Sequence, residues 1–184
     1  MKKRKILYFL GRGSYFLSHR LPTAQAALAL DYEIHVMAID DDVSDQFLRQ
    51  GFVLHPRVMQ SDARPIISTV FGFFQLLYLG LVLQPKIIHV IGLKSSPLGL
   101  SAALICGSSR FLFSINGLGF LFSPFAHSKF HSVIRYVVIK MFSIISKLRD
   151  IEILFQNDDD KRTFENHGLL SNAKSHIVRG SGVE

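Results

Sequence analysis

The sequence predicts an α/β protein built on a doubly wound, mostly parallel sheet, and two observations support this prediction. Short apolar segments typical of buried strands alternate with longer helical segments along nearly the whole chain, as expected when helices connect parallel strands. The first strand, over residues 6–10, continues into a glycine-rich turn over residues 11–14, and a helix rich in Ala and Leu begins near Ser18. A strand, a glycine-rich turn and a helix in this order open a Rossmann-like sheet, in which ligands bind beyond the carboxyl end of the first strand.

In the first half of the chain, recognisable stop signals separate the expected elements. Three aspartates follow the second strand, Gly51 ends the next helix, and Pro85 ends a long apolar helix, because proline lacks the N–H that would continue the helix and glycine favours helix ends. We expect a helix to Leu30, a strand over residues 33–39, a helix over 43–51, a strand over 52–57 and a helix over 66–84.

The second half repeats the alternation with similar signals. Glycines break the chain after residue 115, Asn157 is a helix-capping residue type, and Gly168 ends the last helix. We expect strands over residues 86–91, 110–115, 151–156 and 176–178, and helices over residues 97–107, 128–149 and 157–167.

Length and composition bound the domain organisation and the class of partner. A chain of 184 residues with 48% hydrophobic residues is one domain with a substantial core. We expect this domain over residues 1–178 and the start of an interdomain linker over 179–184, because no closing helix follows the last strand. The net charge of +7 favours an anionic partner, whether phosphate, nucleic acid or a lipid surface. The single Cys106 cannot form an internal disulfide, and no signal peptide is expected, because the apolar run after residues 2–5 is too short.

The segment over residues 66–84 carries no charge and is bracketed by Arg64-Pro65 and Pro85-Lys86. As a helix it would measure about 28 Å, close to the thickness of a bilayer core. Its four polar residues, Ser68, Thr69, Gln75 and Gln84, weaken a transmembrane interpretation. A transmembrane span, a helix on the membrane surface and an ordinary core helix all remain open.

Several candidate binding residues follow the strands at one edge of the predicted sheet. Gly11 and Gly13 could bring backbone N–H groups and a helix dipole to a phosphate, or form a tight turn without a ligand. They are not the full dinucleotide fingerprint, because Phe16 stands where the third glycine would be. The other candidates at this edge are His19, Arg20, Lys94, Asn116, Gly117 and Gly119. His19 and Arg20 either face a phosphorylated ligand or are solvated residues of a first helical turn.

For the acidic and histidine clusters, we expect structural roles rather than ligand sites. The aspartates at positions 40–42 could hold a metal–nucleotide, or a ribose hydroxyl as in NAD enzymes, but we expect a solvated loop that caps the next helix. His127 and His131 are spaced by four residues and lack an obvious third ligand, so we expect no metal site. His89, inside a strand, is expected to be a core or edge residue.

Five motifs in order resemble the N-terminal half of family 4 glycosyltransferases. They are FLSHRLP after the first glycine turn, Lys94-x-x-Pro97-x-Gly99, Gly117-Leu118-Gly119 with Phe122, residues 155–159 (FQNDD) with Phe164 downstream, and Gly180-Ser181-Gly182-Val183. The most similar subgroup is the bacterial enzymes that extend polyprenyl-diphosphate-linked saccharides.

The resemblance implies the N-terminal half of a GT-B fold, in which two Rossmann-like domains face a cleft and transfer retains the anomeric configuration without a metal or other cofactor. It implies a nucleotide sugar, a UDP-sugar, as donor, a polyprenyl-diphosphate-linked saccharide as acceptor, the inner face of the bacterial plasma membrane as location, and no nucleic acid. It assigns Gly11, Gly13, Asn116, Gly117 and Gly119 to the donor diphosphate, His19, Arg20 and Lys94 to the acceptor, and Gly180, Ser181 and Gly182 to the interdomain connection.

Two departures from the family pattern limit the expected activity. Glu184 stands where the family has Asp, and the C-terminal pair of glutamates separated by seven positions is absent. We therefore expect half of a hexosyltransferase, inactive alone and without assignable catalytic residues. Two alternatives stay open: a non-catalytic membrane-associated subunit that pairs with a separate donor-binding chain, and an NAD-binding oxidoreductase domain that uses Asp40.

Overall fold

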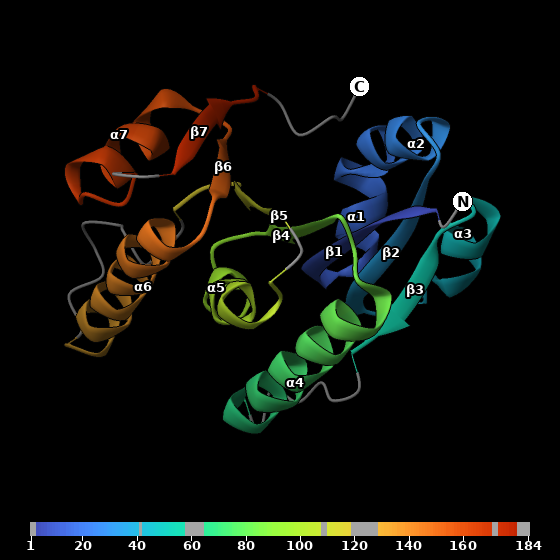
Figure 1. Cartoon of the computed structure of the whole chain (residues 1–184), viewed down its shortest axis with the longest axis horizontal. Coiled ribbons are helices and arrows are strands. Elements are labelled where there is room, and N and C mark those ends of the chain that lie inside the picture. Colours follow the sequence, from blue (N-terminus) through green and yellow to red (C-terminus); the bar gives the residue numbers. More distant parts are fainter. Residues whose placement is uncertain are drawn as a thin grey trace.

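The computed structural model describes residues 3–40, 42–57, 65–107, 110–118, 129–170 and 173–179. Strands and helices alternate along these residues (Figure 1). The strands are β1 (Arg4–Arg12), β2 (Tyr32–Ile39), β3 (Val53–Pro56), β4 (Ile87–Ile91), β5 (Arg110–Ile115), β6 (Ile151–Phe155) and β7 (Lys174–Ile177). The helices are α1 (Gly13–His19), α2 (Leu21–Ala29), α3 (Ser44–Arg49), α4 (Pro65–Leu83), α5 (Ser96–Ile105), α6 (Lys129–Leu148) and α7 (Asp158–Asn166).

All strand pairs of the sheet are parallel, and the strand order is β3-β2-β1-β4-β5-β6-β7. The chain adds β2 and β3 on one side of β1 and then crosses to add β4 and the later strands on the other side. This order confirms the predicted doubly wound Rossmann-like sheet and places the first strand near its middle. The order reverses between β1 and β4, which is where such sheets bind ligands.

Alternate residues of β1 point to two separate cores, because successive side chains of a strand face opposite sides of a sheet. Leu7 and Phe9 of β1 pack in the core beneath α4, α5, α6 and α7, whereas Tyr8 and Leu10 pack in the core beneath α1, α2 and α3. Figure 1 shows α4, α5 and α6 in one layer, in which α5 contacts both of its neighbours.

The beginning of the chain differs from the prediction in two ways. The expected turn at residues 11–14 is absent, because β1 continues through Arg12 and pairs it with Ile39 after an irregularity that follows Phe9. The helix therefore starts at Gly13 rather than near Ser18, and it breaks at Arg20 into α1 and α2. Pro22 lies in the first turn of α2 and has no N–H to continue the hydrogen bonds of α1.

The long apolar segment forms α4, which packs on the sheet through Leu76 and Leu79. Among the described residues, no helix has the length and apolar character needed to cross a membrane. This finding does not support the transmembrane interpretation of residues 66–84. The interpretations as a membrane-surface helix and as a core helix both stay open.

Candidate functional site

The candidate site lies at the carboxyl ends of β1, β4 and β5, where α1 begins directly after β1. Gly11 is exposed at the end of β1, and Gly13 is buried at the first position of α1. β1 runs into α1 without an intervening loop, so α1 begins at this edge of the sheet. This arrangement brings the α1–α2 break to the residue that follows β5.

Arg20 is the centre of this site. It stands at the break between α1 and α2, its side chain is buried, and its Nη2 donates a hydrogen bond to Asn116 Oδ1 over 2.7 Å. Asn116 in turn donates from Nδ2 to the hydroxyl of Tyr15, also over 2.7 Å. These bonds join two residues that the sequence assigns to different ligands, and the burial of Arg20 rules out the solvated-helix interpretation for its side chain.

His19 lies beside this chain of hydrogen bonds, half-buried at the end of α1. Its ring stacks on Tyr15 with the ring centroids 4.2 Å apart, and its Nδ1 is 2.6 Å from the hydroxyl oxygen of Ser18. Ring stacking and a hydrogen bond at Nδ1 together fix the orientation of the imidazole.

Beneath Arg20, a buried polar layer crosses the sheet. Tyr8 and His89 are register partners on β1 and β4, with ring centroids 5.1 Å apart, and His89 Nε2 is 2.7 Å from Ser114 Oγ. Burial, and then the positive charge of Arg20, lower the pKa of His89 to about 3. Burial also raises the pKa of Tyr8 to about 12, against the opposing effect of Arg20. Both side chains are therefore neutral at pH 7, and His89 is a core residue as the sequence predicts.

The remaining predicted site residues are less closely assembled. Lys94 is exposed in the turn between β4 and α5. Gly117 follows Asn116 with a φ of +124°, a conformation that favours glycine. Gly119, Gly180, Ser181 and Gly182, together with Asp41, Arg64, Phe122, His127 and Glu184, lie outside the described residues.

Asp40 supports the capping interpretation of the acidic cluster. Its Oδ1 accepts a hydrogen bond from the backbone N–H of Val43 over 3.2 Å, and its Oδ2 accepts one from the hydroxyl of Ser44 at the start of α3. Both carboxylate oxygens are thus engaged by the chain, which leaves a weak basis for an NAD ribose site. Within the described ranges, no group of three or more His, Cys, Asp or Glu side chains is arranged to hold a metal ion.

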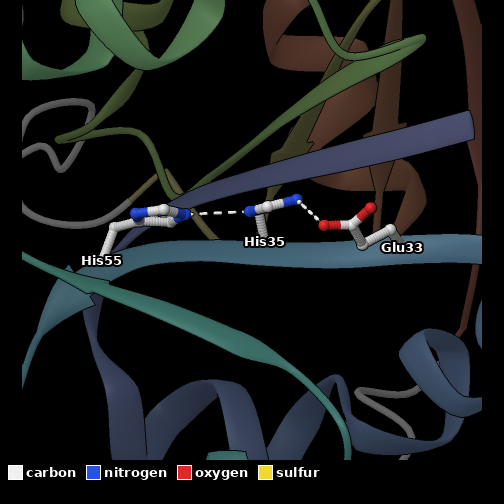
Figure 2. A network of polar contacts seen from close by, with 3 residues as sticks. All are labelled: Glu33, His35 and His55. Carbon is white, nitrogen blue, oxygen red and sulfur yellow. Dashed lines mark hydrogen bonds and ion pairs between the residues drawn. The ribbon is translucent and has the colours of Figure 1, made fainter. Parts of the chain in front are cut away.

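A second polar network, shown in Figure 2, lies on β2 and β3 and was not predicted from the sequence. His35 Nε2 is 2.9 Å from Glu33 Oε1, and His35 Nδ1 is 2.9 Å from His55 Nε2. Burial lowers the pKa of both histidines, although Glu33 opposes this for His35. The network faces the α4 side of the sheet, because His35 alternates with Ile34 and Val36, which belong to the opposite core. It is therefore separate from the site around Arg20.

The outer surface of α4 is apolar. Its exposed side chains recur every three or four residues and so share one side of the helix; Phe74 and Tyr78 are the most exposed, at 61% and 62%. We define the apolar α4 face as Ile67, Val70, Phe71, Phe74, Tyr78, Leu81 and Val82. Contiguous exposed apolar residues of this kind typically mark an interaction surface.

The outer surface of α6, in the same layer, is both apolar and basic. Val133, Tyr136, Val137 and Ile144 are exposed there, together with Lys140 and Lys147. The ammonium group of Lys140 lies 5.5 Å from the centroid of the Tyr136 ring. The layer of α4, α5 and α6 therefore combines apolar side chains with positive charge.

Comparison with known proteins identifies the chain at the level of its family and fold. The sequence pattern described as glycosyl transferase 4-like matches residues 5–148. No curated protein sequence matches the chain.

Solved structures share the fold at low sequence identity. A glycosyltransferase from Rickettsia africae superposes with a TM-score of 0.64 and 12% identity, over 96% of this chain and 43% of that chain. The Anabaena protein HepE in complex with UDP-glucose gives 0.61 and 12%, over 94% and 43%. The UDP-GlcNAc 2-epimerase from Methanocaldococcus jannaschii gives 0.61 and 13%, over 96% and 45%. The chain thus spans less than half the length of these proteins.

These findings agree with the strand order and with the position of the candidate site. The fold is that of the N-terminal Rossmann-like domain of GT-B glycosyltransferases, and the family pattern extends from β1 into the end of α6. Since that pattern covers well over half of the sequence, the chain belongs to the glycosyl transferase 4-like family.

Proposed function

We propose that the chain is the acceptor-side domain of a retaining family 4 glycosyltransferase that works at a membrane surface. The intact enzyme transfers a hexosyl group from a UDP-sugar to a polyprenyl-diphosphate-linked saccharide. The main support for a lipid-linked acceptor is the apolar α4 face. A soluble acceptor gives no reason to expose aromatic side chains such as Phe74 and Tyr78.

Charge complementarity supports the proposal that the layer of α4, α5 and α6 binds the surface of a bilayer. The basic side chains Lys140 and Lys147 are exposed on α6 in the same layer, and each Lys or Arg close to an anionic membrane surface contributes about 1 kcal/mol. Aromatic residues such as Tyr78 and Tyr136 suit the interface, since their rings are apolar and their hydroxyls are polar. The domain is therefore proposed to lie on the cytoplasmic side of the bacterial plasma membrane as a peripheral protein.

The site at the carboxyl edge supplies binding rather than bond-breaking groups. Transfer requires the leaving diphosphate to be stabilised and the acceptor hydroxyl to be held in near-attack geometry. In this proposal Gly11, Gly13, Asn116, Gly117 and Gly119 approach the donor diphosphate, and His19, Arg20 and Lys94 contact the acceptor. Gly180, Ser181 and Gly182 lead to the donor-binding domain, which would complete the cleft.

Vesicle sedimentation tests the membrane part of the proposal. We expect the chain to bind vesicles of phosphatidylcholine with phosphatidylglycerol more strongly than vesicles of phosphatidylcholine alone. Replacing two members of the apolar α4 face, in the double variant Phe74→Glu/Tyr78→Glu, is expected to reduce binding severalfold. Leu48→Glu is the matched control, because Leu48 is 76% exposed but lies on α3 in the other layer. Equal binding by the double variant and the control would contradict the proposal.

Activity tests the transferase part. In a two-domain enzyme that contains this domain, His19→Ala and Lys94→Ala are expected to lower the rate of sugar transfer to a polyprenyl-diphosphate-linked saccharide. Unchanged turnover in both variants would show that the acceptor assignment is wrong.

A further inference from the structure

Arg20 is a buried cation without a described anionic partner. Its side chain is only 9% exposed, and within the described part of the chain its Nε is buried and has no hydrogen-bond partner. Within the same residues, its guanidinium donates one hydrogen bond, to the neutral side-chain oxygen of Asn116. Among the described carboxylates, none lies within ion-pair distance of it. A buried charge in this state is strongly unfavourable unless another group compensates it.

The groups next to Arg20 do not supply a negative charge. Tyr8 and His89, whose titration its charge affects, are both neutral at pH 7. Ser114 and Tyr15, which complete the polar layer, are neutral hydroxyl groups. The local environment is therefore positive and is lined with neutral hydrogen-bonding groups.

The guanidinium is nevertheless held in place and lies close to the surface. Asn116, which fixes Nη2, is itself fixed by the hydroxyl of Tyr15, and both residues are only partly buried. Beside them, a Cβ added at Gly117 would meet no atom of the described residues within 4 Å. A ligand that approaches the guanidinium from this edge would have to displace the Asn116 side chain from it.

We propose that Arg20 binds a diphosphate group, and that the side-chain oxygen of Asn116 occupies the position of a phosphate oxygen when no ligand is bound. This inference rests on the proposed function and deepens it. Arg20, assigned to the acceptor, is hydrogen-bonded to Asn116, assigned to the donor, so a diphosphate bound at Arg20 would lie where the two groups of residues meet. A phosphate oxygen accepts a stronger, charge-assisted hydrogen bond from guanidinium than an amide oxygen does, and arginine fits phosphate with two parallel bonds. Binding would also neutralise the buried charge.

Titration of the 184-residue chain with inorganic pyrophosphate tests this inference. The measurements are calorimetry and the ¹H–¹⁵N signal of Arg20 Nε–H, at ionic strength kept constant with NaCl. We expect saturable binding that shifts the Arg20 signal and slows its exchange with water. In Arg20→Met, which keeps an unbranched stem and removes the guanidinium, affinity should fall about tenfold to a hundredfold.

Arg57→Met is the matched control. Arg57 also has a buried Nε without a partner in the described residues, but it follows β3 and lies against Gly72 of α4. Its replacement should leave pyrophosphate affinity within about twofold of wild type. Equal losses in the two variants, or no saturable binding to the wild type, would overturn the inference.

Two further ligands distinguish the source of the diphosphate. Tighter Arg20-dependent binding of geranyl diphosphate assigns the site to the lipid acceptor, and tighter Arg20-dependent binding of UDP assigns it to the donor. Either result supports diphosphate binding at Arg20. Because these titrations need neither vesicles nor sugar transfer, their failure is distinguishable from failure of the proposed function.

Discussion

The guanidinium of Arg20 and the side-chain oxygen of Asn116 are joined by a 2.7 Å hydrogen bond, although the two residues are 96 positions apart. The bond ties the α1–α2 break to the residue that follows β5, across the point where the strand order reverses. It therefore fixes the spacing between the two segments that would contact a ligand at this edge. Removal of this hydrogen bond should lower the free energy of unfolding as well as change ligand binding.

Asn116→Ala is expected to destabilise the domain by about 1–3 kcal/mol, because it removes the acceptor for Arg20 and the donor for Tyr15 and leaves buried polar groups unpaired. Asn116→Asp should recover much of this loss, since a carboxylate can pair with the buried guanidinium. Urea unfolding measures both effects. Asn166→Ala, at the exposed end of α7, is the control and should change the free energy of unfolding by less than about 0.5 kcal/mol. A loss of stability in Asn116→Asp as large as in Asn116→Ala would contradict the assigned role of the bond.

The class of sheet was predictable from the sequence, but the burial of Arg20 was not. The alternation of β-branched runs with longer helices determines the class of sheet, and most expected bounds agree with the observed elements to within a few residues. Arginine, by contrast, is rarely buried, so from the sequence alone an arginine is expected to be exposed to solvent. The burial follows from the break between α1 and α2 and from the pairing of β1 with β4 and β5, which are tertiary relationships.

The His35–His55 contact illustrates the same limit. The alternation of Glu33 and His35 places them on one face of β2, and this signal was available in the sequence. That His55 joins them depends on the register of β3, which pairs His55 with Met37 and so brings it diagonally opposite His35. Short edge strands carry little sequence information about their register.

Acid should destabilise the domain through His89. Burial lowers the pKa of His89 in the folded state to about 3. Between this value and 6.5, His89 is protonated in the unfolded state and neutral in the folded state, so the free energy of unfolding rises with pH. The contribution of neutral His89 is fully present above the unfolded pKa of 6.5 and is lost as the pH falls toward 3. The total loss is up to about 5 kcal/mol.

Denaturant unfolding between pH 7.5 and pH 4 measures this dependence, with His89→Gln as the comparison because glutamine stays neutral and can hydrogen-bond Ser114. The variant should show a shallower slope. A smaller slope of the same sign should remain, since burial also lowers the pKa of His35 and His55. If the wild type and the variant show the same slope, His89 is not the group that titrates.

Gly99, part of the motif shared with family 4 glycosyltransferases, is explained by packing between α5 and the sheet. A Cβ at this position would lie 2.4 Å from Cγ2 of Val90 and 3.1 Å from Cε1 of Phe113, and both side chains are fully buried. Valine is stiff about χ1, so Val90, the nearer neighbour, cannot turn away easily. Gly99→Ala is therefore expected to destabilise the domain by about 1–3 kcal/mol.

Gly11→Ala provides the contrast, because a Cβ at Gly11 would meet no atom of the described part of the chain within 4 Å and its φ is not positive. Its effect on the unfolding free energy should stay within about 0.5 kcal/mol. The double variant Gly99→Ala/Val90→Ala should recover part of the loss of Gly99→Ala, since shortening Val90 makes room for the new methyl group. If the losses of Gly99→Ala and Val90→Ala simply add in the double variant, the two residues are not in the close contact that brings α5 onto β4.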